Sequence, residues 1–271
     1  MSERIAFIGG GNMASAIIGG LVKQGTSSQD IDVIEPFDAA RDKLQSNFGI
    51  QAQAQAGAFL SHARLVVWAV KPQTFQQAAL VVAPHTSVAL HLSVAAGIRS
   101  HSMAGWLATE RIVRAMPNTP ALIGKGITGL FARAGVSRED QAQVSRVLSG
   151  TGESIWLDTE EKLDVVTALS GSGPAYVFYF MEAMTTAGVE MGLSREQAHQ
   201  LAVSTFAGAS ELARTSTESP QLLRQRVTSK GGTTYAAISS MENNDMRAQF
   251  IEALYAARER AKELGDEFGL A

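Results

Sequence analysis

Short apolar runs alternate with segments of helical spacing through the first half of the chain. Each run is rich in β-branched residues and has few polar positions, as in Leu65–Val70, which reads LVVWAV. Strands that are apolar on both faces are typical of parallel sheets, because helices cover such a sheet on each side. The sequence therefore predicts an α/β fold built on a doubly wound parallel sheet. The expected strands are residues 4–8, 31–35, 65–70, 88–94 and 111–116, with 127–133 and 154–157 as further candidates.

Strand character ends near residue 158, and helical spacing dominates the remainder of the chain. We therefore expect two domains, residues 1–158 with the sheet and residues 159–271 with helices alone. Ser194 is a good N-cap for one of these helices, and Gly192 is a good stop for the helix before it. The expected helices are residues 160–169, 174–191, 195–214, 221–228, 234–241 and 245–264.

The helix expected at 175–191 is apolar around nearly its whole circumference. Glu182 is the only charged residue before Glu190. A helix that is apolar all round must be buried on every side. A small bundle can hardly bury it alone, so the sequence predicts a second subunit as its cover.

Composition excludes several classes of protein. The 271 residues carry a formal net charge of −3 and no cysteine, so bulk nucleic-acid binding, disulfides and thiolate chemistry are not expected. No apolar stretch reaches the length of a bilayer span, and the first residues do not resemble a signal peptide. We expect a soluble cytoplasmic protein that binds neither membrane nor nucleic acid. No metal site is expected, because ligand spacing is missing on any one helix face among the histidines at 62, 85, 91, 101 and 199.

A glycine-rich turn follows the first expected strand. Gly9 to Ala14 read GGGNMA, which has the G-x-G-x-x-A form. Gly9 suits the tight turn, Gly11 lets backbone approach a pyrophosphate, and Ala14 permits close packing of helix on strand. Free N–H groups at a helix start attract a phosphate. The pattern favours a dinucleotide cofactor, although such turns also occur for packing reasons alone.

Glu35 ends the second expected strand, 21 residues after Ala14. An acidic side chain at this distance is placed to accept hydrogen bonds from the adenosine ribose, and it would repel the 2′-phosphate of NADP. Glu35 therefore favours NADH over NADPH. Alternatively, Glu35 is a solvated charge neutralised by Arg41 or Lys43, and Arg41 itself can serve a 2′-phosphate.

Five further motifs follow in order: AVKP at 69–72, SVAAG at 93–97, RAMPNTP at 114–120, ALSGSGPAY at 168–176 and VTSKGGTT at 227–234. With these motifs the chain resembles the Δ1-pyrroline-5-carboxylate reductase family over essentially its whole length. The resemblance implies an N-terminal Rossmann domain and a C-terminal all-α dimerisation domain that interlocks with a partner. It also implies homodimers, often assembled as decamers (pentamers of dimers), and hydride transfer from NADPH or NADH to a small cyclic imine in proline biosynthesis.

The resemblance also implies a set of site residues. Asn118 could line the nicotinamide end together with Pro117, but the pair is equally typical of a rigid turn. Glu160 matches a substrate-contact position, although a helix N-terminal charge explains it as well. The implied cofactor residues are Gly9, Gly11, Asn12, Met13, Ala14, Glu35, Ala69, Val70, Lys71, Pro72, Ala95, Ala96, Gly97 and Asn118.

The implied substrate site is the loop Ser229–Thr234, at the start of an expected helix. Backbone N–H groups there would bind a carboxylate as helix starts bind phosphates. The Thr234 hydroxyl matches the position that hydrogen-bonds the imine nitrogen, so Thr234 is the candidate catalytic residue. An ordinary glycine-rich connection is the alternative. The implied substrate residues are Glu160, Ser229, Gly231, Gly232, Thr233 and Thr234.

Two positions depart from the family pattern. Lys230 stands where many relatives have proline, which adds a cation near the expected carboxylate. Ala56 stands where relatives commonly have an asparagine that contacts the cofactor. Three other functions remain open: a β-hydroxyacid dehydrogenase, in which Lys162 is the nearest catalytic candidate; a reductase of another cyclic imine; and a non-catalytic NAD(H) sensor.

Overall fold

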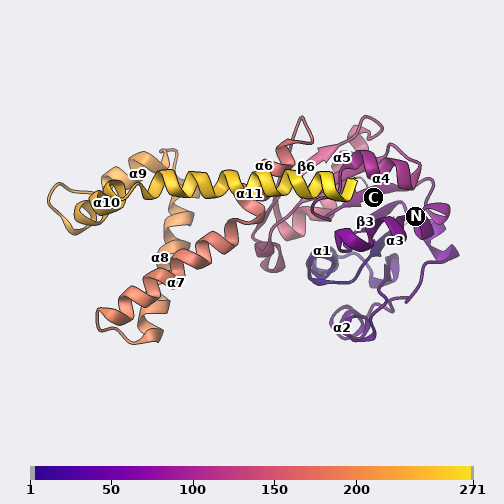
Figure 1. The fold of residues 1–271 in the computed structure, drawn as a ribbon. Helices are drawn as coiled ribbons and strands as arrows, with labels where there is room; N and C mark the ends of the chain where they lie inside the picture. Colours follow the sequence, from indigo (N-terminus) through magenta and orange to yellow (C-terminus); the bar gives the residue numbers. More distant parts are fainter. Residues whose placement is uncertain (1–3, 270–271) are drawn as a thin grey trace. The chain divides into compact units, whose positions relative to one another are not determined.

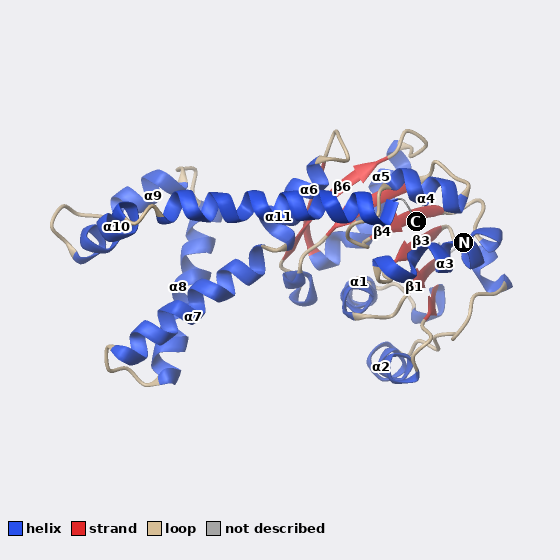
Figure 2. Ribbon diagram, in the orientation of Figure 1, coloured by secondary structure: helices blue, strands red, loops and turns tan. Residues whose placement is uncertain are grey.

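The computed structural model describes residues 4–269 and divides the chain into two compact units. Unit 1 comprises the residues up to Ser172 together with those from Ala257 onward, and unit 2 is Gly173–Ala256. Among the described residues, every strand belongs to unit 1, as the red arrows of Figure 2 show. This division differs from the boundary at 158 that the sequence suggests.

Unit 1 is built on one sheet of seven strands in the order β2-β1-β3-β4-β5-β6-β7. These strands lie in the part of the chain that Figure 1 colours indigo to pink. The chain leaves β1 in one direction to form β2 and then crosses to form β3 on the other side of β1. Open α/β sheets bind ligands at the carboxyl ends of the strands where the order reverses in this way. The strands are β1 (Ile5–Ile8), β2 (Ile31–Ile34), β3 (Leu65–Trp68), β4 (Leu90–Ser93), β5 (Ile112–Met116), β6 (Gly126–Ala132) and β7 (Gly152–Trp156).

The sheet is parallel except where β5 meets β6. β5 ends at Met116 and β6 begins at Gly126, with only the short helical turn Thr119–Ile123 between them. A parallel connection needs a crossover of a dozen or more residues, so the chain turns back and pairs antiparallel. The doubly wound sheet predicted from the sequence is confirmed as a mostly parallel one.

Two apolar clusters cover the faces of the sheet. On one face Ile5 and Phe7 pack with Ile17 and Ile18 of α1 (Asn12–Lys23) and with Val144 of α5 (Arg138–Leu148). On the other face the cluster contains Trp68 and residues of α3 (Pro72–Val82) and α4 (Ser100–Leu107). Successive residues of a strand point to opposite faces of the sheet. Because both faces are covered by helices, neighbouring residues of a strand must both be apolar. The unbroken apolar runs of the sequence have this cause.

The segment after β7 still belongs to unit 1. Leu163 of α6 (Lys162–Val166) is buried, and a Cβ added at Gly129 of β6 would meet Val166 at 2.9 Å. A π-helix at Thr167–Gly171 follows. The end of α11 (Met246–Gly269) returns to unit 1, where Phe268 packs on the second apolar cluster. Helical periodicity alone does not reveal that these helical residues pack on the sheet domain.

Unit 2 consists of α7 (Gly173–Glu190), α8 (Arg195–Thr215), α9 (Pro220–Arg226), α10 (Thr233–Asn243) and the first part of α11. The predicted N-cap is confirmed, because the Ser194 hydroxyl accepts the N–H of Gln197 in a full capping box. Inside the unit Phe250 makes edge contacts with Tyr176 and Phe180.

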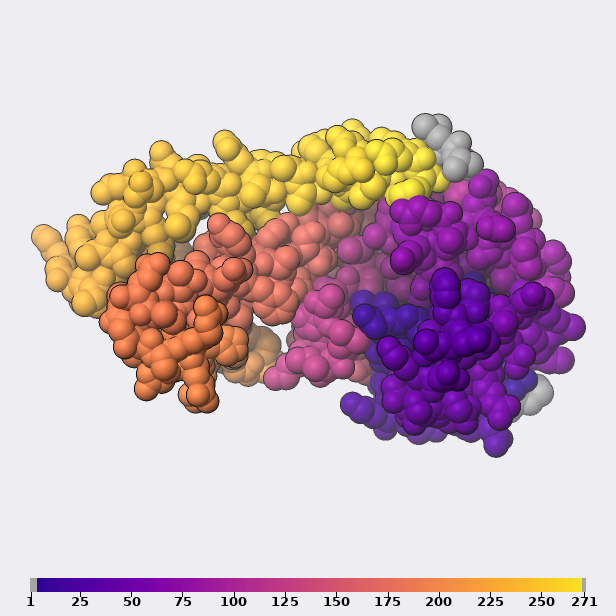
Figure 3. Space-filling view, turned by 60° about the horizontal axis from the view of Figure 1, so that its bottom comes forward, coloured from indigo at the N-terminus to yellow at the C-terminus, as the bar shows by residue number. Residues whose placement is uncertain are grey.

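Unit 2, coloured salmon to light orange in Figure 3, leaves much apolar surface uncovered. On α7, Phe178 is 62% exposed and Tyr179 is 70% exposed, and Leu201 and Leu212 of α8 are exposed as well. Large exposed apolar patches mark surfaces that bind another protein. The single chain therefore leaves the apolar helix α7 without a complete cover. No helix within residues 4–269 is both long and apolar enough to cross a membrane.

We expect the stability of unit 1 to fall at mildly acidic pH because of His91. This side chain is buried in β4, its Nδ1 accepts the indole N–H of Trp68 at 3.0 Å, and burial lowers the pKa of His91 to about 4. Between pH 6.5 and 4 the unfolded chain binds this proton and the folded chain does not. Stability is therefore full above pH 6.5, and the free energy of unfolding falls by about 3 kcal/mol toward pH 4.

Chemical denaturation of the wild type and His91→Gln across that pH range measures the effect. The variant is expected to lose most of this slope, whatever its stability at neutral pH. His101→Gln, which removes an exposed histidine of α4 instead, is the control. An unchanged slope in His91→Gln would contradict the assignment.

Candidate functional site

The turn between β1 and α1 has the geometry that its glycines predict. Gly9 has φ +97°, and a Cβ there would lie 2.6 Å from the carbonyl oxygen of Ala69 at the end of β3. Gly11 is the N-cap of α1, makes no side-chain cap, and has open space where a Cβ would lie. The first turn of α1 contains no acidic residue. An uncapped helix start facing open space fits a phosphate.

Glu35 follows β2 and is buried against this turn. Its carboxylate accepts the N–H of Gly10 at 2.8 Å and the N–H of Phe37 at 3.0 Å. The side chain therefore braces the glycine turn. This contact differs from the ribose contact that the sequence suggests for Glu35.

Arg41 lies in the helix α2 (Asp38–Phe48) that follows β2, and its side chain reaches back to the end of that strand. Its guanidinium donates to the carbonyl oxygens of Glu35 and Pro36, both at 2.9 Å, and pairs with the exposed carboxylate of Asp38. Ala56 packs against the second apolar cluster. Arg41 thus keeps a positive charge at the carboxyl end of β2, where a 2′-phosphate of a dinucleotide would lie.

Two further predicted segments come to the same edge of the sheet. Residues 69–72 follow β3, and Pro72 begins α3 without a side-chain cap at Lys71. Residues 95–97 follow β4, where Ala95 donates its N–H to the Ser93 hydroxyl at 3.3 Å. Because β1, β3 and β4 are neighbours, their carboxyl ends meet here. We call this edge, with the segments 9–14, 69–72 and 95–97, the cofactor edge.

Asn118 is buried, and both ends of its amide are engaged within unit 1. Its side-chain oxygen accepts the N–H of Ile127 at 3.0 Å, and its nitrogen donates to the carbonyl oxygen of Ser170 at 3.1 Å. These bonds tie the turn after β5 to β6 and to the π-helix. The rigid-turn alternative for this motif therefore describes the side chain better than a nicotinamide contact.

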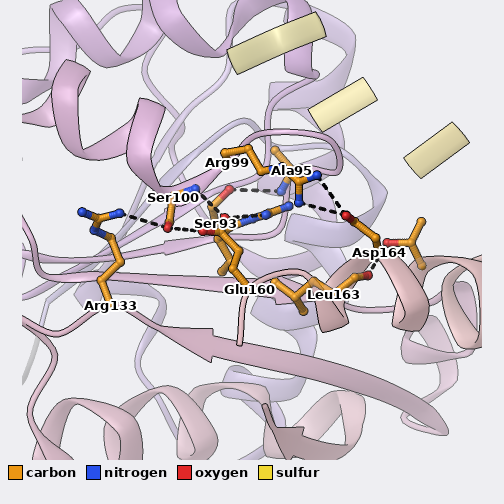
Figure 4. Close-up of polar contacts among 10 residues, drawn as sticks. Ser93, Ala95, Arg99, Ser100, Arg133, Glu160, Leu163 and Asp164 are labelled. Atoms are coloured by element: carbon orange, nitrogen blue, oxygen red, sulfur yellow. Dashed lines mark hydrogen bonds and ion pairs between the residues drawn. The ribbon is translucent and has the colours of Figure 1, made fainter. Parts of the chain in front are cut away.

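Glu160 lies in unit 1, in the centre of a buried polar network (Figure 4). Its carboxylate accepts the Ser100 N–H, the Ser100 hydroxyl and the Arg114 guanidinium, each at 2.6 Å. Burial by itself raises the pKa of Glu160, but the charge of Arg114 and the bonds from Ser100 more than offset it and hold the pKa below its ordinary value. The carboxylate is fully engaged by these partners, whereas the sequence suggests a substrate contact.

The partners of Glu160 are not among the site residues that the sequence predicts. Arg114 lies in the otherwise apolar strand β5 and is buried, which alone signals a buried partner of opposite charge. Arg99 pairs with Asp164 at 2.9 Å, and Arg133 donates to the Ser100 hydroxyl at 3.2 Å. We call these six side chains the Glu160 network: Arg99, Ser100, Arg114, Arg133, Glu160 and Asp164.

The loop Ser229–Thr234 lies in unit 2 and has the form expected of an anion-binding turn. Gly231 has φ +78°, and Gly232 is the N-cap of α10 without a side-chain cap. Gly232 donates its N–H to the Ser229 carbonyl oxygen at 3.0 Å, and the first turn of α10 contains no acidic residue. Thr233 and Thr234 therefore open the helix with N–H groups that no cap occupies. We call Ser229–Thr234 the substrate loop.

Lys162 and the acidic and histidine side chains bear on whether the chain uses hydroxyacid or metal chemistry. Lys162, the candidate for hydroxyacid chemistry, is exposed and pairs with Asp158 one turn away at 2.6 Å, as a surface lysine does. Within residues 4–269 there is no group of three or more acidic or histidine side chains that could hold a metal ion.

Known proteins resemble this chain over its whole length. Residues 160–264 match the family model described as pyrroline-5-carboxylate reductase dimerisation, and residues 4–97 match that of the coenzyme F420-dependent NADP oxidoreductases. The pyrroline-5-carboxylate reductase of Pseudomonas aeruginosa is 44% identical over 99% of both chains.

Solved structures agree in fold. A pyrroline-5-carboxylate reductase from Coxiella burnetii has a TM-score of 0.91 and 37% identity, covering 97% of this chain and 99% of its own. The enzyme from Plasmodium falciparum, solved with NADP bound, has a TM-score of 0.87 and 28% identity, covering 97% and 98%. The protein therefore belongs to the pyrroline-5-carboxylate reductase family.

Proposed function

We propose that this chain reduces Δ1-pyrroline-5-carboxylate to L-proline with NADPH or NADH, the last step of proline biosynthesis. The observation that carries the proposal is the likeness to a pyrroline-5-carboxylate reductase at 44% identity over 99% of both chains. Two uncapped helix starts, those of α1 and α10, support it, because the reaction needs one site for a pyrophosphate and one for a carboxylate.

The cofactor edge would hold the dinucleotide. The N–H groups after Gly9 would bind the pyrophosphate, with the open space at Gly11 admitting it, and Glu35 would keep the turn in place. Segments 69–72 and 95–97 would carry the rest of the molecule toward the nicotinamide. When bound, the reduced nicotinamide supplies the hydride that the imine carbon accepts.

The substrate loop would hold the imine acid. Backbone N–H groups of Gly231 and Thr233 would bind its carboxylate, and the Ser229 hydroxyl would add a donor. Gly232, whose N–H is donated to the Ser229 carbonyl oxygen, would hold the turn in shape. The Thr234 oxygen would accept the N–H of the protonated imine, which is a better hydride acceptor than the neutral one. Thr234 is too weak an acid to supply that proton, so we assign its source to water or to substrate that arrives protonated. The role of the substrate loop is to orient the imine relative to the nicotinamide, and a fixed helix start is well suited to this.

We also propose a cytoplasmic homodimer that assembles further into a decamer. The match of residues 160–264 to a dimerisation model supports the dimer, as do the exposed apolar side chains of α7 and α8. The lack of cysteine suits a reducing compartment. Sedimentation velocity would distinguish a dimer from a decamer by mass.

Steady-state oxidation of NADPH and of NADH, measured with Δ1-pyrroline-5-carboxylate and with its six-membered analogue, tests the reaction. We expect turnover with the five-membered imine and a lower kcat/KM with the six-membered one. Preference for the six-membered ring would assign the enzyme to another imine. No turnover with either imine would remove the proposal.

A further inference from the structure

We propose that Glu160 is a positioning residue for the dinucleotide: through Ser100 and Arg114 it fixes the loop 94–99, which carries the cofactor segment 95–97. The inference rests on the proposed function only in taking segment 95–97 as part of the cofactor site. It replaces the substrate contact that the sequence suggests for Glu160.

The contacts show what Glu160 holds. Ser100 is the first residue of α4, and the N-cap before it, Arg99, provides no side-chain cap. Glu160 takes over this function from 60 residues away, because it accepts both the N–H and the hydroxyl of Ser100 at 2.6 Å. Its third bond, to Arg114 of β5, anchors the carboxylate to the sheet. The start of α4 is therefore tied directly to the central strands.

The loop that leads into α4 is held at its other points as well. Ala95 donates to the Ser93 hydroxyl at the end of β4. Gly97 has φ +72°, and a Cβ there would meet Phe268 at 3.2 Å and Leu264 at 3.3 Å. Segment 95–97 is therefore held on one side by the end of β4 and on the other by the close approach of α11. A shift at Ser100, three residues beyond Gly97, would pass directly to it.

The chemistry of the Glu160 network suits it to fixing the position of a segment more than to stabilising the fold. The cost of burying Arg114 and Glu160 consumes most of what their pairing gains, so a buried ion pair is weak evidence for stability. A charged group with several short bonds does, however, allow only one geometry. Arg133 and the Arg99–Asp164 pair add further bonds around the same point, as the dashed lines of Figure 4 show. Hydrogen-bonded residues behind a binding segment can hold it in place to within about 0.5 Å.

The chain contains a matched control built in the same way. Asp140 accepts the Ser137 N–H at the start of α5 at 3.0 Å and pairs with Arg111 at 2.7 Å. Burial also tends to raise the pKa of Asp140, and Arg111 and Ser137 more than offset this. Arg111 precedes β5 and α5 follows the antiparallel β6, so this pair lies at the opposite edge of the sheet from the cofactor edge.

Equilibrium titration of NADPH, without substrate, compares Glu160→Gln with Asp140→Asn. We expect the dissociation constant to rise about 10-fold in Glu160→Gln and to stay within about 2-fold of wild type in Asp140→Asn. Thermal unfolding of the ligand-free variants is expected to show losses of similar size in both. Ser100→Ala, which keeps the ion pair, is the second variant if Glu160→Gln does not fold, and it is expected to weaken binding in the same direction.

Three results would overturn the inference. Equal, small changes of the dissociation constant in Glu160→Gln and Asp140→Asn would make Glu160 a helix cap only. A raised KM for the imine with unchanged NADPH binding would restore the substrate contact. Wild-type protein that binds no NADPH would remove both this inference and the proposed function, whereas binding without imine turnover would remove the proposed function alone.

Discussion

Thr234→Ala is expected to lower kcat/KM for Δ1-pyrroline-5-carboxylate by about 10- to 100-fold. A hydrogen bond to a charged partner contributes about 1.5–3 kcal/mol, and each 1.4 kcal/mol lost from transition-state binding is about tenfold in rate. Thr234 is the second residue of α10, directly after the uncapped turn at Gly231 and Gly232. Its backbone position does not depend on its hydroxyl, so the variant keeps the helix start that would bind the carboxylate.

The measurement is steady-state reduction of the imine at saturating NADPH, with Thr234→Ser and Thr233→Ala as controls. Thr234→Ser keeps a hydroxyl at the same position and is expected to restore most of the activity. Thr233→Ala removes a neighbouring hydroxyl but keeps its N–H, so its effect is expected to be small. The NADPH dissociation constant is expected to be unchanged in all three. Wild-type turnover by Thr234→Ala would exclude its hydroxyl from the mechanism.

The fold could be predicted because its determinants are local. Strands β1 and β3 are apolar at every position, which identifies a sheet covered on both faces, and the glycine turn after β1 places the ligand edge. The helical character of residues 173–256 follows from their spacing and from a capping box at Ser194. Each of these signals is carried by residues that are close together in the sequence.

The orientation of the acidic side chains could not be predicted, since it depends on distant partners. Glu35 lies at the end of β2 as the sequence predicts, but the Gly10 N–H that donates to its carboxylate lies 25 residues away. Glu160 finds Ser100 and Arg114, which are 60 and 46 residues away. A sequence motif fixes which residue stands at a turn, whereas tertiary packing decides what its side chain binds.

Asn118 and the domain boundary have the same explanation. The turn that contains Asn118 is recognisable, but its bond to Ser170 exists only because the π-helix packs beside β5. Residues 160–172 have helical spacing, which by itself predicts that they belong to the helical domain. Leu163 and Val166 nevertheless pack on the sheet of unit 1. Periodicity reveals that a helix has an apolar face, and not which surface covers it.

Glu35→Ala is expected to lower the free energy of unfolding by about 2–3 kcal/mol, because the buried N–H of Gly10 and the partly buried N–H of Phe37 lose a charged acceptor. The glycine turn loses its brace, so NADPH and NADH are expected to bind more weakly by a similar factor, with their ratio of kcat/KM changed less than about 3-fold. If Glu35 instead repelled a 2′-phosphate, its removal would shift that ratio toward NADPH by about 10-fold or more. Asp42→Ala is the control, because it removes an exposed acidic charge from the helix Asp38–Phe48 that follows and leaves the pair of Arg41 with Asp38 intact. Denaturation and paired kinetics with both cofactors decide between bracing and discrimination, since only discrimination changes the ratio.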